Sequence, residues 1–191
     1  MSQTEELDFR TTMEALFVDA LGGQMTPGLK ERLREEGLDL DRLAPAYPRR
    51  VFSRCCRITA EALYPHDPVD QALRTLGRLM IEGYSRSVIG RAVAGVFIVV
   101  GVRRAMERVT RAFRHGDNYT VTKFTPVSEG VADLWFNQVN GQPTFTQGAL
   151  EAALAWVGGK DGRVDIVRTD GDECLYRLRW GEAAGATGAG T

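Results

Sequence analysis

The 191-residue chain is poor in the residues that cross-link a small protein or hold a metal ion. It has three cysteines, Cys55, Cys56 and Cys174, and two histidines, His66 and His115. Cys55 and Cys56 are adjacent, which is a poor geometry for a disulfide, and no CxxC or HxxxH spacing occurs. We therefore expect neither a disulfide framework nor a structural zinc site, and we expect a reducing, cytoplasmic location.

The chain also lacks a long apolar run and a large net charge. The longest run, 92–102, is interrupted by two glycines and falls short of the roughly 20 residues that a spanning helix needs. Residues 1–10 are acidic and polar, unlike a secretory leader. We therefore predict no membrane span and no export signal. Because 24 basic residues oppose 25 acidic ones, the total charge does not favour nucleic acid, and we expect no nucleic-acid partner.

The motifs of common enzyme classes are absent as well. The sequence contains no GxGxxG, GxxxxGK[ST], GxSxG or HExxH, so a glycine-rich nucleotide loop, a serine nucleophile elbow and a zinc peptidase centre have no support. Cys55 and Cys56, flanked by Arg54 and Arg57, are the candidates for an activated thiol. An enzyme or redox protein that uses these thiols stays open as an alternative.

Helical periodicity dominates the chain up to residue 113, after a loose terminus at residues 1–8. Apolar residues recur at helical spacing, and Thr-Pro, Pro and Gly signals mark the starts and stops. Glycines at 77, 83, 90 and 95 lie among apolar residues, which predicts close helix–helix approach or kinks. The predicted helices span residues 12–21, 27–36, 48–64 and 69–113, the last with breaks near 87–90 and at 101, and residues 38–47 are a connector.

After residue 115 the period changes from helical to alternating. This β-β-α-β-β order makes an antiparallel sheet the natural arrangement. We therefore predict one α+β domain over residues 9–180, with an N-terminal helical layer packed on a C-terminal antiparallel sheet, and a disordered Gly/Ala-rich tail at 181–191. The predicted strands span 119–124, 131–139, 163–168 and 174–180, with a helix at about 146–157.

Positive charge is concentrated in the helical middle of the chain, where residues 49–114 hold 13 arginines and five acidic side chains. One helix carries Arg104, Arg108, Arg111 and His115 at spacings of four, three and four residues, and four more arginines lie between 49 and 57. Arginine binds carboxylate and phosphate through two parallel hydrogen bonds. The helix face that carries Arg104, Arg108, Arg111 and His115 is therefore a candidate site for an anionic ligand or an acidic protein partner. The alternative is that the arginines lie on solvated helix faces and form ion pairs with the acidic ends of this chain.

Four sequence runs carry a resemblance to a known family. They are IEGYSRSVIGRA at 81–92, GVRRAMERVTRAFRHGDNYTVTK at 101–123, LWFNQVNGQPTFTQGALEAAL at 134–154 and YRLRW at 176–180. Together they resemble the Myxococcales-restricted family of uncharacterised paralogous proteins, over about residues 9–180. That family is distantly similar to the haem–nitric-oxide-binding domains, the vinyl-reductase-associated domains and the TRAPP tethering-complex subunits. The resemblance implies ligand sensing in a hydrophobic pocket, or dimerisation and scaffolding.

The resemblance can be carried to single residues. The haem branch implies a propionate-binding Tyr-x-Ser-x-Arg motif, and here Tyr119 begins the matching run and Lys123 ends it, with no serine between. His115 precedes that run and is not convincingly placed as an axial ligand. The TRAPP branch implies an acyl chain on a cysteine beside a helical channel, for which Cys55 or Cys56 is the candidate. We therefore expect no resident cofactor, with haem or an acyl chain as the alternatives.

These observations favour a non-enzymatic regulatory or scaffolding domain that binds a protein partner or a small apolar ligand as a homodimer. One alternative is a sensor of haem or an acyl chain, of the haem–nitric-oxide-binding or vinyl-reductase-associated type, and the other is the thiol-dependent enzyme. Trp135 joins the candidate residues because aromatic bulk beside the amide-rich segment 137–145 suits an interface as well as the edge of the core. The full set of candidate ligand- or partner-binding residues is Arg104, Arg108, Arg111, His115, Tyr119, Lys123, Trp135, Cys55 and Cys56.

Overall fold

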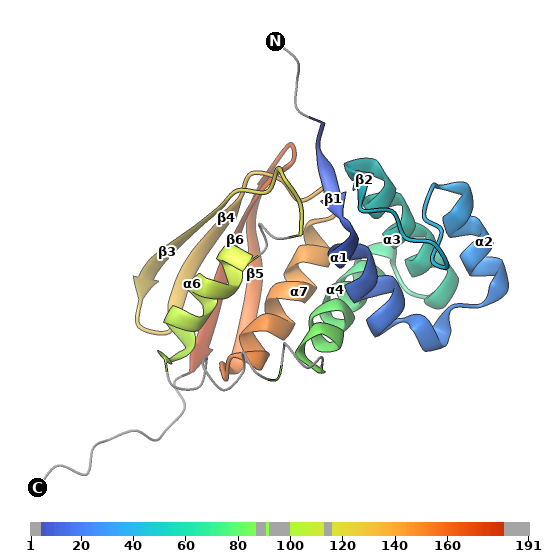
Figure 1. Ribbon diagram of the computed structural model, residues 1–191. Coiled ribbons are helices and arrows are strands. Elements are labelled where there is room, and N and C mark those ends of the chain that lie inside the picture. Colours follow the sequence, from blue (N-terminus) through green and yellow to red (C-terminus); the bar gives the residue numbers. More distant parts are fainter. Residues whose placement is uncertain (1–4, 87–90, 92–99, 113–115, 182–191) are drawn as a thin grey trace, which may run out of the picture.

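The chain folds into a helical layer and a sheet layer (Figure 1). The computed structural model describes residues 5–86, 91, 100–112 and 116–181. The predicted break near 87–90, His115 and the predicted tail beyond 181 lie outside the described residues. In chain order the elements are β1 (Leu7–Phe9), α1 (Arg10–Met13), the π-helix η1 (Glu14–Ala20), the 3-10 turn η2 (Gly22–Gln24), α2 (Pro27–Glu35), β2 (Ala46–Pro48), α3 (Arg49–Leu63), α4 (Val69–Arg86), α6 (Val102–Ala112), β3 (Thr122–Ser128), β4 (Val131–Phe136), α7 (Pro143–Trp156), β5 (Lys160–Asp170) and β6 (Glu173–Gly181).

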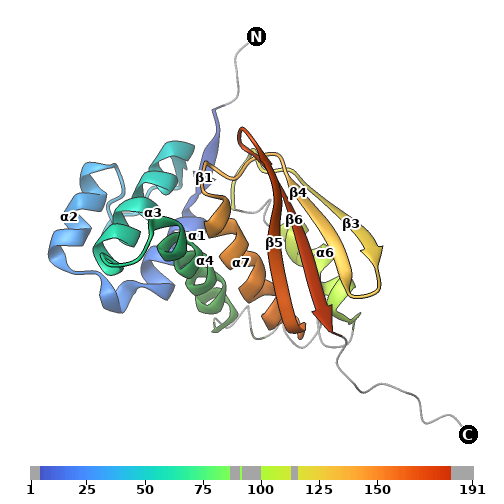
Figure 2. The ribbon, with the colours of Figure 1, turned by 180° about the vertical axis from the view of Figure 1, so that it is seen from behind.

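The second half of the chain forms a four-stranded antiparallel sheet with the strand order β3-β4-β6-β5. This confirms the predicted α+β class. Alternate residues of β4 and β6 are buried, with Leu134 opposite Tyr176 in the register. The helices α6 and α7 pack on this apolar face, and Figure 2 shows that no described helix covers the opposite face.

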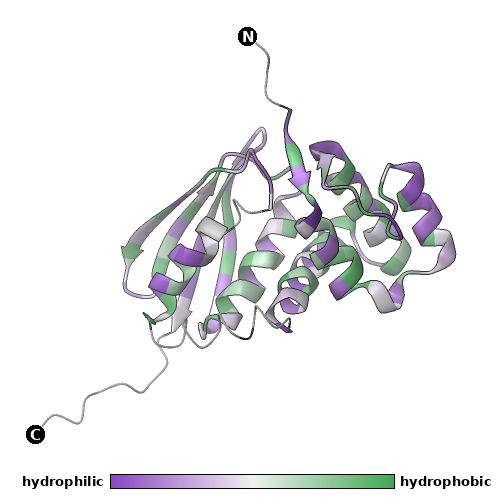
Figure 3. Cartoon of the chain, viewed as in Figure 1, coloured by the Kyte–Doolittle hydropathy of each residue, from purple (hydrophilic) through white to green (hydrophobic). Residues whose placement is uncertain are grey.

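The first half of the chain packs its own core around α3 and α4. Phe17, Phe52 and Phe145 form a chain of edge-to-face contacts, with ring centroids 6.1 and 5.5 Å apart, an arrangement that aromatic pairs prefer. Since Phe145 belongs to α7, this chain of rings joins the helical layer to the sheet layer. Figure 3 shows hydrophobic residues gathered on α4 and α7 between the layers, whereas α2 at the far end is largely hydrophilic.

The two layers approach most closely where α4 crosses α7. A Cβ atom added at Gly77 would lie 2.0 Å from the carbonyl oxygen of Phe145, and one at Gly148 would lie 1.9 Å from that of Arg74. No side chain fits at either position, so the two glycines set the distance between the helices. The close approach predicted for Gly77 is confirmed, and that for Gly83 also, against Ala20.

The N-terminal segment is the first departure from the sequence prediction. Leu7–Phe9 forms the strand β1 where a loose terminus was expected. On one side β1 pairs with Ala46–Pro48, within the predicted connector. On the other side the Phe9 amide donates to the carbonyl oxygen of Gly116 (2.8 Å) and the Asn118 amide to that of Leu7 (3.2 Å). A three-residue strand shows no periodicity, and this one depends on partners far along the chain.

The strand predicted at 119–124 is the second departure, because β3 begins only at Thr122. One carboxylate oxygen of Asp117 accepts hydrogen bonds from the amides of Tyr119 (3.0 Å) and Thr120 (2.6 Å), which forms a turn of the Asx type. The Asn137 side chain accepts from the Val121 amide (2.6 Å) and donates to the Tyr119 carbonyl oxygen (3.0 Å). These side-chain bonds replace strand pairing and leave Tyr119 in a loop.

The long helical territory predicted over 69–113 is divided as expected at residue 101. Gly101 adopts a φ of +79°, in the left-handed region that ends helical runs and favours glycine, and α6 begins at the next residue. None of the helices among the described residues is long and apolar enough to cross a membrane.

Candidate functional site

A cavity of about 540 Å³ lies where the helical layer, α6, α7 and one end of the sheet meet. This volume falls within the roughly 300–1,000 Å³ of small-molecule sites in proteins. Its wall is formed by residues of β1, α1, η1, α3, α4, α6, α7, the 116–120 loop, the end of β4 and the loop after it. Six aromatic side chains contribute to the wall: Phe52, Tyr84, Tyr119, Phe136, Phe145 and Trp156.

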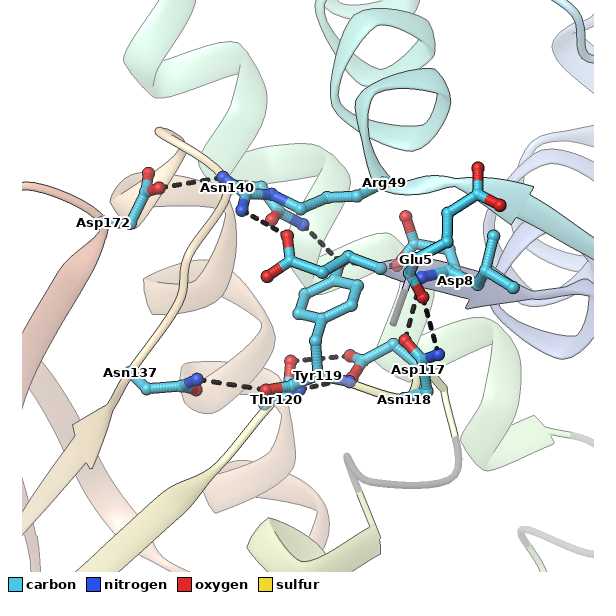
Figure 4. Close-up of polar contacts among 12 residues, drawn as sticks. Glu5, Asp8, Arg49, Asp117, Asn118, Tyr119, Thr120, Asn137, Asn140 and Asp172 are labelled. Atoms are coloured by element: carbon cyan, nitrogen blue, oxygen red, sulfur yellow. Dashed lines mark hydrogen bonds and ion pairs between the residues drawn. The ribbon is translucent and has the colours of Figure 1, made fainter. Parts of the chain in front are cut away.

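One part of the wall is polar and centres on Tyr119 (Figure 4). The Tyr119 hydroxyl donates a hydrogen bond to Oδ1 of Asp8 (2.8 Å) and accepts one from Nδ2 of Asn140 (2.9 Å). These three residues come from β1, the 116–120 loop and the loop after β4, so the network joins segments more than 100 residues apart. Burial, followed by the negative charge of Asp8, raises the pKa of Tyr119, which keeps its hydroxyl protonated and able to donate.

Asp8 is the buried residue of β1, with 2% of its surface exposed. Burial raises the pKa of its carboxyl from 3.8 to about 7, because a low-dielectric surrounding disfavours the charged form. The nearby charge of Asp117 acts in the same direction, whereas the hydrogen bond from Tyr119 and the charge of Arg49 oppose it. Asp8 is therefore an acid that changes its charge near neutral pH.

Arg49 connects the N-terminal segment to the sheet beside this network. Its Nη1 lies 2.7 Å from Oε2 of Glu6 and its Nη2 lies 2.9 Å from Oδ2 of Asp172, in the β5–β6 turn. Its guanidinium carbon lies 5.9 Å from the centre of the Tyr119 ring, within range of a cation–π contact. Arg49 is thus bound by acids of both ends of the chain, as the ion-pair alternative for the helical arginines predicted. Arg54 pairs in the same way with Glu36.

Several polar atoms of the cavity residues lack partners. Oδ2 of Asp8, Oε1 of Gln138 and Oδ1 of Asn140 are buried without a hydrogen bond, and all three residues line the cavity. Buried polar atoms are rarely left unpaired in native proteins. All three are hydrogen-bond acceptors, so the polar part of the wall has a surplus of acceptors.

The structure places the sequence-predicted residues in four different environments. Arg108 and Tyr119 line the cavity. Arg104 is exposed on α6 and is not part of the wall. Lys123 and Trp135 are paired in the register and lie away from the cavity, with the Trp135 indole donating to Glu173 at 3.1 Å. The side chain of Arg111 and all of His115 lie outside the described residues.

Cys55 and Cys56 lie in the core of the helical layer, with no exposed surface. Burial raises the pKa of the Cys55 thiol to about 12 and that of Cys56 well above its ordinary value. Neither cysteine lines the cavity. A thiolate nucleophile needs a lowered pKa and access to its substrate, and these two thiols have neither.

Sequence reasoning missed Asp8, Gln138 and Asn140. Asp8 was assigned to a loose terminus, and the segment 137–145 was interpreted as the edge of the core or as an interface. One signal was available for Asp8: it is an acid between two apolar residues, Leu7 and Phe9. Only a β1 strand with both edges paired makes that position buried.

Comparison with solved structures shows the class of fold. A mutant of the Cs H-NOX protein is 13% identical, with a TM-score of 0.65, and the match covers 92% of this chain and 98% of that one. An H-NOX protein from S. oneidensis in the Fe(II)NO ligation state is 14% identical, with a TM-score of 0.63 and coverages of 90% and 99%. An oxygen-binding H-NOX domain related to soluble guanylate cyclases is 15% identical, with a TM-score of 0.57 and coverages of 94% and 96%. At these identities the likeness shows an H-NOX-like fold.

The chain itself belongs to a family described as Protein of unknown function (DUF2378), which it matches over residues 6–181. No curated protein matches the chain in sequence. The resemblance to a family of uncharacterised proteins is therefore confirmed, and the chain shares the fold of the H-NOX proteins.

Proposed function

We propose that this protein is a small-molecule sensor domain that binds its ligand in the cavity between the helical layer and the sheet. The observation that carries this proposal is the cavity itself, about 540 Å³ in volume and lined mainly by apolar and aromatic side chains. The H-NOX-like fold supports it as an analogy of architecture.

The position of the cavity suggests how binding is transmitted. A ligand there contacts β1 and α4 on one side and α7 and the 137–142 loop on the other. It therefore stabilises one relative position of the two layers, and a ligand shifts an equilibrium by its difference in affinity for the two states. The homodimer expected from the sequence stays a prediction, which light scattering tests.

Haem is the first ligand to consider, since one similar H-NOX protein is in an Fe(II)NO ligation state. Haem iron in proteins is held by His, Cys, Met or Tyr. The described cavity residues include no histidine or cysteine, and the Tyr119 hydroxyl is protonated and bonded to Asp8. Met80 offers a thioether, a ligand that accompanies a histidine in cytochromes. Tyr84 also lines the cavity, with its ring edge to face against Trp156 at 5.8 Å, and His115 lies outside the described residues. The described lining therefore offers no histidine or cysteine to haem iron, and the proposal concerns another small molecule.

A dye-binding experiment with a cavity-filling variant tests the proposal. Nile red is a neutral dye whose emission rises in apolar surroundings, and it should bind the native protein. Ala15 lines the cavity, so Ala15→Phe should place a ring inside it and abolish the emission change. Ala155→Phe puts the same ring on the exposed side of α7 and is the matched control. Equal dye binding by both variants, with equal melting temperatures, would refute the proposed site.

A further inference from the structure

We propose that the ligand of this cavity is a small organic amine, whose ammonium group binds the carboxylate of Asp8 while its apolar body packs among the aromatic rings. The inference rests on the proposed function, because it assigns a chemical class to the ligand of the same cavity. Three independent features of the wall favour an amine: its charges, its unpaired acceptors and its rings.

The charges of the wall favour a cation. Asp8, Asp117 and Arg108 are the charged residues among the described lining. Asp117 is occupied by the amides of Tyr119 and Thr120 and by the Thr120 hydroxyl (2.6 Å). Arg108 is exposed on α6, where water screens its charge. The ionised form of Asp8 is therefore the charge that lacks a partner inside the cavity.

Arg49, the cation that acts on Asp8, is already paired with two other acids. It faces Asp8 from α3 and binds Glu6 and Asp172. The other groups that act on Asp8 or respond to it are Asp117 and the hydroxyl of Tyr119 from the 116–120 loop, together with the buried thiol of Cys56 from α3. None of these is cationic. A ligand ammonium would supply the missing positive charge, as in other buried ion pairs that are also hydrogen-bonded.

The unpaired acceptors match the donors of an ammonium group. A primary ammonium group has three N–H donors and no acceptor, and the wall holds three unpaired acceptor oxygens, on Asp8, Gln138 and Asn140. These oxygens have almost no exposed surface. The amine therefore reaches them by turning the carboxyl and carboxamide planes, whose terminal torsions are broad. Turning Asp8 and Asn140 gives up their hydrogen bonds with the Tyr119 hydroxyl, which the N–H donors of the ammonium group offset. A carboxylate ligand would instead meet three acceptors, one of them on the acid Asp8.

The aromatic rings complete the match. Phe52 and Phe145 lie edge to face, and Tyr84 and Trp156 do the same at 5.8 Å, and all four line the cavity. Aromatic faces attract ammonium groups, and more strongly where water is excluded. An aryl or alkyl body of the ligand also loses its exposure to water among these rings.

Three probes of nearly equal shape test the chemical class. They are 2-phenylethylamine, 2-phenylethanol and phenylacetate, titrated by calorimetry into the full chain at millimolar concentration. We expect the amine to bind at least about tenfold more tightly than the alcohol, which corresponds to about 1.4 kcal/mol, and phenylacetate to bind weakest. Between pH 5.5 and 8 the affinity for the amine should rise as Asp8 ionises, whereas that for the alcohol should stay constant.

Two variants separate the role of Asp8 from general effects of charge. Asp8→Asn should reduce the preference for the amine to about twofold or less. Asp165→Asn removes an acid from the exposed side of β5 and should leave the preference unchanged. The pH series on the unaltered chain keeps the inference testable should Asp8→Asn fold poorly.

The inference and the proposed function fail in different ways. Equal affinities for the three probes, with no effect of Asp8→Asn, would overturn the amine and leave the sensor cavity standing. Binding of Nile red without binding of any probe would have the same meaning. Failure of Nile red and of all three probes to bind would overturn the proposed function and the inference together.

Discussion

Replacing Asp8 by asparagine should remove the pH dependence that this residue gives to stability. The pKa of Asp8 is about 7 in the folded chain and has an ordinary value of 3.8. The folded state therefore holds the proton more tightly than the unfolded state does. For such a group the contribution to stability is greatest below pH 3.8, falls as pH rises, and is lost completely above pH 7. Each pH unit across this window costs about 1.4 kcal/mol.

The asparagine variant removes this dependence and changes little else. Its side chain has the same shape, and its carbonyl oxygen accepts the hydrogen bond that Tyr119 donates to Asp8. Other titrating groups act equally on both proteins and cancel in the comparison. From pH 4 to pH 8 the free energy of unfolding of the variant, relative to the original chain, should therefore rise by about 3–4 kcal/mol. In the absence of ligand the variant should be the more stable protein at pH 8.

Urea unfolding at several pH values measures this difference, with the transition midpoint taken at constant m-value. Asp165→Asn is the control, because that acid lies on the exposed side of β5 and its removal should shift the relative stability by less than about 1 kcal/mol. A gap between the original chain and Asp8→Asn that stays constant from pH 4 to pH 8 would refute the reasoning. It would mean that the carboxyl of Asp8 reaches water in the folded protein.

Two further predictions concern the helical crossing and the thiols. Gly77→Ala should lower the free energy of unfolding by about 3 kcal/mol or more in urea titrations, because its Cβ would lie 2.0 Å from the Phe145 carbonyl oxygen. Gly28→Ala, with nothing within 4 Å, should be neutral or stabilising by up to about 1 kcal/mol. Equal effects of the two substitutions would contradict the close crossing. The thiols of Cys55 and Cys56 should react with a disulfide reagent such as DTNB only as fast as the protein unfolds, since both are buried with raised pKa values. Rapid reaction in native buffer would instead support an enzyme or redox protein that uses these thiols.

The elements that local chemistry specifies could be predicted from the sequence. Thr26 and Pro27 were expected to begin a helix, and the Thr26 hydroxyl accepts from the Leu29 amide (3.2 Å) at the start of α2. Alternation predicted the hairpins of the sheet, and glycines among apolar residues predicted the close approach at Gly77. For the helix start and the hairpins, the signal and the structure lie within a few residues of each other. The glycine signal indicates a close approach but does not identify its partner, Phe145 of α7.

The cavity could not be predicted in this way, because its wall is assembled from segments distant in sequence. Asp8 is buried only since β1 is paired on both edges, with β2 and with the loop at 116–118. Tyr119 lines the cavity only since Asp117 and Asn137 hold its backbone out of the strand. Arginine spacing, by contrast, pointed to α6, where Arg108 lines the cavity but Arg104 does not. The spacing of the arginines identifies one face of α6 but does not show which residues of the other segments pack against that face.

The burial of Asp8 lowers the free energy of unfolding when its carboxyl is ionised, a cost that a solvent-exposed position would avoid. The fold keeps the side chain buried. Backbone bonds fix β1 on both sides, so the side chain cannot turn to water without breaking a strand. An acid held in this way destabilises the ligand-free domain above pH 7 by the several kcal/mol that its raised pKa implies. A cationic ligand that pairs with the carboxylate offsets that cost and stabilises the state in which both layers contact it. The residue that weakens the ligand-free fold is therefore the one that couples ligand binding to the packing of the two layers, which is what a sensor requires.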